Sequence, residues 1–336
     1  MKFPKVSIIM SVYNGSDYIE ETLRSIFEQE YKNFELIIID DASTDNTVEI
    51  INKFQDKRVI LKINNENKRL AYNLNVAISL AEGEYIARID ADDICSMDRL
   101  TKQVNLLEEN SNLLIVGGYA KQFGDSHKLM KYPLIHEEIK TALLFENCLC
   151  HPAVMYRNKP EVIQYDPEFK ASQDYELWTR LIWSEEFANI SDIVLNYRVH
   201  KKQTKFVLHE EQNSGARYAR LFMLKKVYAE ATEDEKELFL LSCNTHIPKT
   251  AEQMRELALL YNNIFNSNSK CSVFDSNILK KYMERQYFKN YYVSLHDNFV
   301  SLKTLLEFVG PSYIASNFGL FVKAYLFYLK QLLKSR

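Results

Sequence analysis

Three aspartates, Asp90, Asp92 and Asp93, form the short stretch of this sequence that is best suited to chemistry, with Ala91 between the first two. They follow Tyr85–Ile89, an apolar run typical of a buried strand. In extended backbone, residues two apart point the same way, so Asp90 and Asp92 can converge. Carboxylates this close repel one another unless a cation or hydrogen-bond donors neutralise them, and oxygen ligands suit Mg²⁺ or Mn²⁺. The alternative is a solvated acidic turn that caps the next helix.

Two other polar segments come directly after predicted strands. Tyr13 follows the β-branched run Val6–Val12, and Asp40 and Asp41 follow Phe34–Ile39. Open α/β sheets bind ligands beyond the carboxyl ends of their strands, where such segments meet. We therefore expect these side chains and the three aspartates to face one crevice.

The elements that must position these residues alternate along the first hundred positions. The predicted strands are Val6–Val12, Phe34–Ile39, Arg58–Ile63 and Tyr85–Ile89. Segments with apolar residues at helical spacing separate them. This alternation predicts an α/β fold, in which a mostly parallel sheet is covered by helices on both faces.

The pattern becomes mixed after residue 110. Short strands and helices are predicted in turn at Leu113–Val116, Glu137–Phe145, His151–Tyr156, Asp174–Trp183 and Ile193–Val199. After residue 201 the strand signals fade, and long helical patterns rich in tyrosine and phenylalanine dominate. We place a domain boundary near residue 205. It separates an α/β domain at 1–205 from a mainly helical C-terminal region at 206–336.

The composition argues against several classes of function. The 336 residues carry 42 Lys and Arg against 45 Asp and Glu, and the pI of about 6.2 leaves no basic footprint for nucleic acid. The glycines form neither a dinucleotide fingerprint nor a P-loop. The cysteine spacing is neither that of a zinc ribbon nor that of a redox pair, which favours reduced thiols in a cytosol. We expect no transmembrane helix, and a first strand instead of a signal peptide.

Seven ordered blocks of the sequence resemble the family 2 glycosyltransferases. They are Val6–Gly15, Phe34–Thr47, Asn67–Ala77, Gly83–Leu100, His151–Arg157, Gln173–Arg180 and Tyr197–His200. The resemblance covers about the first 205 residues and implies a GT-A fold that uses nucleotide sugars.

The resemblance also implies roles for the residues that match the family's motifs. Tyr13 and Asp41 correspond to the residues at the base and ribose end of the nucleotide. Arg69 stands where a phosphate or base contact is expected. An aromatic ring and a hydrogen-bond acceptor on adjacent strand ends are suited to holding uracil. Taken alone, these residues also fit packing for Tyr13, helix capping for Asp41 and an ordinary surface position for Arg69.

Asp90, Ala91 and Asp92 correspond to the family's D-x-D motif, which implies Mn²⁺ or Mg²⁺ as cofactor. The resemblance makes Asp92 the more direct metal ligand, and we expect Asp93 to orient the loop or the sugar. His200 is suited to binding the metal or to donating to the diphosphate, since imidazole serves either role. A lone histidine after a strand is also commonly structural.

Sugar transfer to a hydroxyl needs a general base for the acceptor, and Asp174 is the candidate. It matches the acid of the family's Glu-Asp motif and opens a predicted helix, although Gln173 stands where relatives usually have Glu. A base opposite the leaving group gives direct attack and inversion. The alternative for Asp174 is the favourable interaction of an acid with the helix dipole. His151 is expected to be structural or to line the acceptor cleft, and Trp178 to lie in the core.

The segment 317–336 places Lys323, Lys330 and Lys334 on one helical stripe, opposite apolar and aromatic side chains. A basic amphipathic helix of this kind can lie at a membrane surface, where lipid-linked acceptors are found. The alternatives are a helix packed on the rest of the protein and a homodimer contact. We expect a cytoplasmic enzyme that contacts the inner face of a bacterial membrane peripherally.

The leading hypothesis is an inverting, metal-dependent glycosyltransferase of bacterial surface polysaccharide synthesis. It would move a hexose or N-acetylhexosamine from a nucleotide-sugar donor, with UDP as the expected nucleotide, to a saccharide or lipid-linked saccharide acceptor. A Mg²⁺-dependent nucleotidyltransferase and a non-catalytic sugar-nucleotide-binding protein are the alternatives. The first would ordinarily have a glycine- and lysine-rich phosphate loop, which Tyr13–Asp17 does not provide.

Overall fold

The computed structural model describes residues 4–201, 203, 208–243, 250–297 and 322. The chain forms two compact units. The first comprises residues 1–139 and 147–216, and the second comprises residues 140–146 and 217–336. The chain therefore enters the second unit for a short segment, returns to the first, and enters the second again. The domain boundary near residue 205 stays a prediction.

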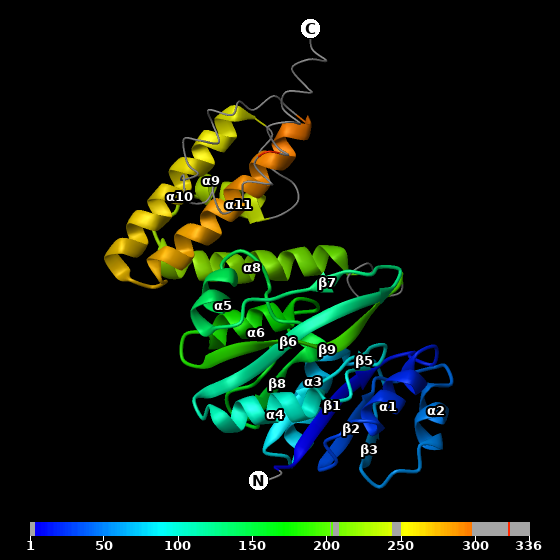
Figure 1. The fold of residues 1–336 in the computed structure, drawn as a ribbon. Helices are drawn as coiled ribbons and strands as arrows, with labels where there is room; N and C mark the ends of the chain where they lie inside the picture. The colour runs from blue at the N-terminus through cyan, green and yellow to red at the C-terminus, as the bar shows by residue number, and fades with distance from the viewer. Residues whose placement is uncertain (1–3, 202, 204–207, 244–249, 298–321, 323–336) are drawn as a thin grey trace. The chain divides into compact units, whose positions relative to one another are not determined.

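A single sheet organises the first unit (Figure 1). Its strands are β1 (Val6–Val12), β2 (Phe34–Asp40), β3 (Val59–Ile63), β4 (Tyr85–Arg88), β5 (Ile94–Cys95), β6 (Leu113–Gly124), β7 (Leu129–Met130), β8 (Met155–Arg157) and β9 (Glu186–Val199). They lie in the order β3-β2-β1-β4-β8-β6-β9-β5, and β7 pairs with β6. The four strands from β3 to β4 are parallel to one another.

The second half of the sheet is mixed. Strand β8 runs antiparallel to both of its neighbours, β4 and β6, whereas β6 and β9 are parallel over most of their length. The short β5 closes this edge antiparallel to β9. The α/β class is confirmed, and the parallel pairing that the sequence predicts is strongest in the first four strands.

The helices of the first unit follow the strands in sequence. They are α1 (Ile19–Phe27), α2 (Thr47–Lys53), α3 (Arg69–Leu80), α4 (Arg99–Glu109), α5 (His136–Ala142), the 3-10 turn η1 (His151–Ala153) and α6 (Gln173–Leu181). Helix α3 packs on β1 and β2, and α1 packs against α2 and β5. Residues 140–142 of α5 already belong to the second unit.

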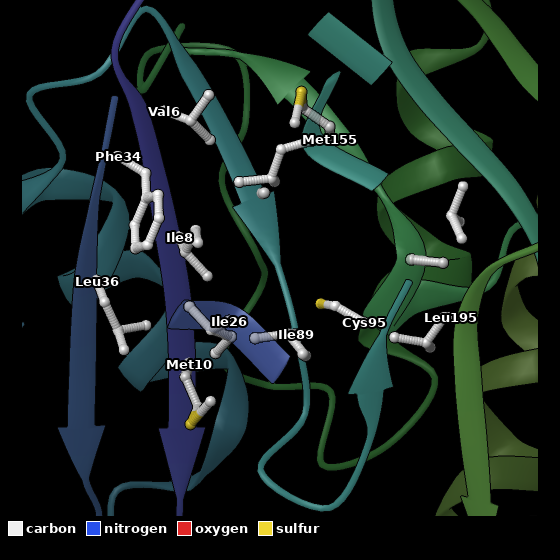
Figure 2. Packing of buried hydrophobic residues seen from close by; sticks show 14 of the residues in the cluster. Val6, Ile8, Met10, Ile26, Phe34, Leu36, Ile89, Cys95, Met155 and Leu195 are labelled. Atoms are coloured by element: carbon white, nitrogen blue, oxygen red, sulfur yellow. The ribbon is translucent and has the colours of Figure 1, made fainter. Parts of the chain in front are cut away.

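The core of the first unit is built on the alternation of β1. Val6, Ile8 and Met10 point to one face of the sheet and are buried there with Ile26 of α1, as Figure 2 shows. Phe34 and Leu36 of β2 add to the same cluster. Burying side chains of this size stabilises the fold by about 1.5–3 kcal/mol each.

Several segments differ from their predicted bounds. Residues 151–153, predicted to be extended, form a 3-10 turn, because Pro152 sits in its first positions and supplies no N–H to a strand. Strand β6 extends to Gly124 and β9 begins at Glu186, so both are longer than predicted. The added residues, 117–124 of β6 and 186–192 of β9, mix glycine and polar residues with apolar ones, so they show no clear strand pattern in sequence.

The second unit is helical in its described part. It holds the later part of α8 (His209–Val227) together with α9 (Glu233–Cys243), α10 (Ala251–Cys271) and α11 (Ser276–Asp297). Phe145 from the inserted segment packs against Phe239 and Tyr261, with ring centroids 5.8 and 6.3 Å away. The basic helix expected at 317–336 lies outside the described residues, Val322 excepted. Among the described helices, none is both long and apolar enough to cross a membrane.

Candidate active site

The carboxyl ends of β1 and β2 are level, which places two of the predicted nucleotide residues side by side. Val12 pairs with Asp40, so Tyr13 and Asp41 are the first residues beyond the paired strands. The backbone N–H of Asp41 donates to the carbonyl of Val12 at 2.8 Å. Tyr13 is 52% exposed, whereas Asp41 is 3% exposed. The ends of these two strands therefore present an exposed aromatic ring beside a buried carboxylate.

Asp41 holds the beginning of α3. Its Oδ1 accepts from the backbone N–H of Lys68 at 2.7 Å and from the side-chain amide of Asn64 at 2.9 Å. Its Oδ2 accepts from the backbone N–H of Arg69 at 2.9 Å. Asp41 thus satisfies free N–H groups at a helix start and fixes the segment that carries the exposed Arg69.

Four residues at or near the predicted site have backbone in the left-handed region. They are Arg69 itself (φ 68°), and Asn14 (φ 51°), Ala42 (φ 62°) and Ser172 (φ 58°), each of which lies within two positions of a predicted site residue. This conformation costs about 1–3 kcal/mol per residue outside glycine, and it clusters at functional sites. The backbone strain therefore supports a functional role for these strand and helix ends.

Asp90 is held by a buried arginine that the sequence analysis did not single out. Nη1 of Arg88 donates to Asp90 Oδ2 at 2.9 Å, and Nη2 donates to Asp90 Oδ1 at 2.5 Å. The Arg88 side chain is 2% exposed and that of Asp90 is 32% exposed. A bidentate pair of this kind fixes the orientation of a carboxylate as well as its charge.

Asp92 is joined to His200, the candidate for binding the metal or the diphosphate. Nε2 of His200 lies 2.8 Å from Asp92 Oδ2. The two side chains are 17% and 24% exposed, respectively, so both are reachable from solvent. The other ring nitrogen of His200 is buried without a hydrogen-bond partner among the described residues.

The three aspartates form a compact donor set. One carboxylate oxygen from each of Asp90, Asp92 and Asp93 lies within 4.8 Å of the others. Asp93 is fully buried, and its Oδ2 has no hydrogen-bond partner in the described part of the chain. An unpartnered buried carboxylate oxygen beside two more carboxylates fits a divalent cation, for which oxygen ligands are preferred. Asp90, Asp92 and Asp93 are the carboxylates that could hold it, with His200 beside Asp92 as a further candidate.

The electrostatics of the cluster reflect this crowding. Burial raises the pKa of Asp93 well above its usual range, and the charges of Asp92 and Asp90 act in the same direction. Burial also raises the pKa of Asp90, although the guanidinium of Arg88 opposes the shift. The charge of Asp174 acts on the pKa of Asp90 in the same direction as burial, as the smallest of these effects. The place of Asp174 as the base of this site stays a prediction.

Asp174 lies in the first turn of α6 and is held by Asn147. The side-chain amide of Asn147 donates to Asp174 Oδ2 at 2.7 Å. Burial raises the pKa of Asp174, and hydrogen bonds from the Tyr175 backbone and from Asn147 offset this only in part. A half-buried carboxylate with a raised pKa is suited to general base catalysis near neutral pH.

Arg198 ties the end of β9 to the D-x-D loop. Its backbone N–H donates to Asp93 Oδ1 and its Nε donates to the Asp92 carbonyl, each at 2.8 Å. The guanidinium lies over the rings of Tyr18 and Phe123, at 4.6 and 4.4 Å from their centroids. Because His200 follows two residues later, this connection also sets the distance between His200 and Asp92.

His151 and Trp178 occupy structural positions. Nε2 of His151 lies 2.8 Å from the hydroxyl of Tyr165, and its ring meets that of Trp178 edge-on. Burial lowers the pKa of His151 well below its usual value, so the imidazole is neutral. Trp178 is fully buried.

Sequence reasoning missed Arg88, Asn147 and Arg198. Arg88 stands two residues before Asp90, and this spacing was the available signal, since residues two apart on a strand share a face. Asn147 precedes Asp174 by 27 residues, and no spacing rule connects them. Arg198 lay within the recognised Tyr197–His200 block, but only the strand pairing brings it to Asp93.

Comparisons with known proteins bear on the family. The family described as Glycosyl transferase family 2 matches residues 7–160. An uncharacterized glycosyltransferase from Haemophilus influenzae is 31% identical over 230 residues, which span 64% of this chain and 71% of that protein. The chain belongs to glycosyl transferase family 2. The resemblance inferred from the seven sequence blocks is therefore confirmed.

Two further comparisons concern a relative of stated activity and a solved structure. WfaP of Escherichia coli, named UDP-Glc:alpha-D-GlcNAc-diphosphoundecaprenol beta-1,3-glucosyltransferase, is 33% identical over 58% of this chain and 77% of its own length. The crystal structure of S. aureus TarS 1-349 in complex with UDP-GlcNAc matches with a TM-score of 0.57 at 18% identity, covering 85% of this chain and 87% of that one. At this identity the match bears on the fold, and the GT-A fold expected from the sequence is confirmed.

Proposed function

We propose that this family 2 chain is an inverting, metal-dependent glycosyltransferase that moves a hexose or N-acetylhexosamine from a UDP-sugar to a hydroxyl. The acceptor would be a saccharide or lipid-linked saccharide of bacterial surface polysaccharide synthesis. The observation that carries the proposal is the cluster of Asp90, Asp92 and Asp93 directly after β4, with Nε2 of His200 2.8 Å from Asp92 Oδ2. The stated UDP-glucose and undecaprenol-linked substrates of the relative WfaP support the donor and acceptor classes.

The donor end would be bound by the residues beyond β1 and β2. The exposed ring of Tyr13 can stack on a base, and the buried Asp41 beside it fixes the start of α3 through its bonds to the backbone N–H groups of Lys68 and Arg69. Arg69, exposed at the start of α3, can contact a phosphate. A Mn²⁺ or Mg²⁺ ion held by Asp92, Asp90 and His200 would neutralise charge on the departing diphosphate.

The acceptor would be activated by Asp174. Its carboxylate takes the proton of the attacking hydroxyl while the oxygen bonds to the anomeric carbon and the bond to the diphosphate breaks. Asn147 keeps this carboxylate oriented by its 2.7 Å hydrogen bond. A single base that acts on the acceptor directly accounts for inversion without a covalent sugar intermediate. Peripheral attachment to the inner membrane face and cytoplasmic location remain part of this proposal.

The test is a panel of nucleotide sugars with the full-length protein and Mn²⁺, followed by substitution of the base. Asp174→Asn should lower transfer by about 10²–10⁴-fold, because the amide cannot accept the acceptor's proton. UDP binding, measured by calorimetry, should be retained.

Equal loss of UDP binding and of transfer in this variant would remove Asp174 from the base role. Release of pyrophosphate from a nucleoside triphosphate, with no sugar transfer from any donor, would favour a nucleotidyltransferase. Nucleotide-sugar binding with no turnover of any donor would favour a non-catalytic binding protein.

A further inference from the structure

We propose that Arg88 is a positioning residue of the cation site, which holds both oxygens of Asp90 and competes with the divalent cation for that carboxylate. Asp92 and His200 are then the stronger ligands of the cation. The inference rests on the proposed function. It assigns a role to a buried residue that lies outside the D-x-D motif.

The alternation of β4 places Arg88 and Asp90 on one face. Ala87 and Ile89 belong to the hydrophobic cluster that includes Ile26 of α1, and Figure 2 shows Ile89 beside Ile26. Their neighbours Arg88 and Asp90 therefore point to the opposite face of the strand. The two-residue spacing lets the guanidinium reach both carboxylate oxygens, at 2.9 and 2.5 Å.

Hydrogen bonds on two sides hold the backbone of Arg88 in place, so the starting position of its side chain is well defined. Its N–H donates to the Val154 carbonyl at 3.0 Å. Its carbonyl accepts from Nη2 of the buried Arg99 at 2.7 Å, and the strand register pairs Arg88 with Ile9. A fork held this firmly loses little conformational entropy when it pairs with a carboxylate.

The burial of Arg88 makes Asp90 its required partner. The side chain is 2% exposed, and its Nε is buried without a hydrogen-bond partner among the described residues. A buried charge is costly unless it is paired and hydrogen-bonded. Both carboxylate oxygens of Asp90 accept charge-assisted hydrogen bonds from Arg88. A cation that binds these oxygens must therefore weaken the pair between Arg88 and Asp90.

Asp92 has a different set of contacts from Asp90. Arg198 donates to the backbone carbonyl of Asp92 at 2.8 Å, whereas Arg88 donates to both carboxylate oxygens of Asp90. Asp92, paired with His200 and not with an arginine, has no such restraint.

The test measures Mn²⁺ affinity of the full-length protein without nucleotide, by electron paramagnetic resonance of the free ion. Arg88→Met should bind Mn²⁺ roughly tenfold more tightly, because removing the competing cation frees Asp90 for the metal. The double variant with Asp90→Asn should lose this gain. Sugar transfer by Arg88→Met should fall, because an added anionic ligand weakens the attraction of the metal for the diphosphate. Arg88→Lys, which retains the charge, should restore part of both values.

Arg157→Met is the matched control for losing a large cationic side chain next to the same strands. Arg157 donates to the Leu113 carbonyl and lies over the Tyr85 ring, at the other end of β4 from Asp90. Its Mn²⁺ affinity should equal that of the wild type. Unchanged or weaker Mn²⁺ binding by folded Arg88→Met would overturn the inference.

A second comparison decides the matter if Arg88→Met does not fold. With Arg88 intact, Asp90→Asn should reduce Mn²⁺ affinity much less than Asp92→Asn does. Equal losses would contradict the competition by Arg88. Sugar transfer by the wild type is scored separately: a protein that uses no nucleotide sugar fails the proposed function, whereas the Mn²⁺ comparisons still decide the role of Arg88.

Discussion

The hydrogen bond from Asn147 to Asp174 sets the protonation of the proposed base. Burial raises the pKa of Asp174, and the Asn147 amide lowers it in part by stabilising the carboxylate. A base must be deprotonated to act, so activity is present above this pKa and is lost as the pH falls through it. Burial and the Asn147 hydrogen bond therefore both affect the pH at which activity falls on the acid side of the pH profile.

We expect Asn147→Ala to move the acid limb of kcat/KM to higher pH. The reason is that removing the donor leaves the burial of Asp174 less compensated, so the pKa of its carboxyl rises further. The measurement is kcat/KM against pH for transfer from the best donor. Asn158→Ala is the control, because Asn158 donates to the Ala81 and Gly83 carbonyls, away from Asp174. An acid limb that stays in place in Asn147→Ala would contradict this account.

At the scale of the element, the end of β9 and the loop after β4 behave as one piece. Arg198 links them through Asp93 Oδ1 and the Asp92 carbonyl, and it also pairs with Glu21 of α1 at 2.5 Å. Its guanidinium lies between the Tyr18 and Phe123 rings. The position of His200 relative to Asp92 thus depends on contacts from α1, β6 and β9 together.

Arg198→Lys should weaken Mn²⁺ binding by roughly tenfold, because second-sphere contacts that orient metal ligands typically account for about 10–100-fold in affinity. An ammonium cannot reproduce the Nε and Nη contacts or the flat stacking. Calorimetric titration with Mn²⁺ measures the change. Lys102→Ala serves as control, since it removes an exposed pair with Asp192 on the neighbouring part of β9. Equal Mn²⁺ affinity in Arg198→Lys and wild type would show that β9 does not position His200.

The elements of the first hundred residues could be predicted because their patterns are local. The alternation of Val6–Val12 and the run Phe34–Ile39 are determined by burial on one or both faces of a strand, which sequence shows directly. The meeting of Tyr13 and Asp41 followed from the rule that parallel strands end at one edge. Both predictions used information that lies within a few residues along the chain.

The rest could not be predicted because it depends on contacts between distant residues. The pairing of β6 with β9 and the bond between Asn147 and Asp174 join segments with no shared pattern. The sequence does not distinguish Arg88 from an ordinary strand residue, because its burial depends on the tertiary structure. The residue roles taken from the resemblance remain predictions, although the structure groups most of their side chains at the strand ends.

At the scale of the whole molecule, the segment 317–336 carries a prediction about membranes. Replacing Lys323, Lys330 and Lys334 by glutamine should reduce co-sedimentation with vesicles rich in anionic lipid by roughly tenfold or more, since each basic residue near such a surface contributes about 1 kcal/mol. Hydrolysis of the donor in solution should not change. Co-sedimentation that is equal for the two proteins, at low salt, would favour a helix that packs on the protein or on a second copy.

The short passage of the chain through the second unit affects how the protein can be divided. Leu143, Leu144 and Phe145 are buried, and Phe145 packs on rings from α9 and α10. Asn147, whose amide donates to Asp174, lies two residues after Phe145. Truncation after residue 216 would remove the Phe239 and Tyr261 rings that pack on Phe145. We therefore expect a version that lacks residues 217–336 to lose stability unless the apolar residues of the segment 140–146 are replaced as well.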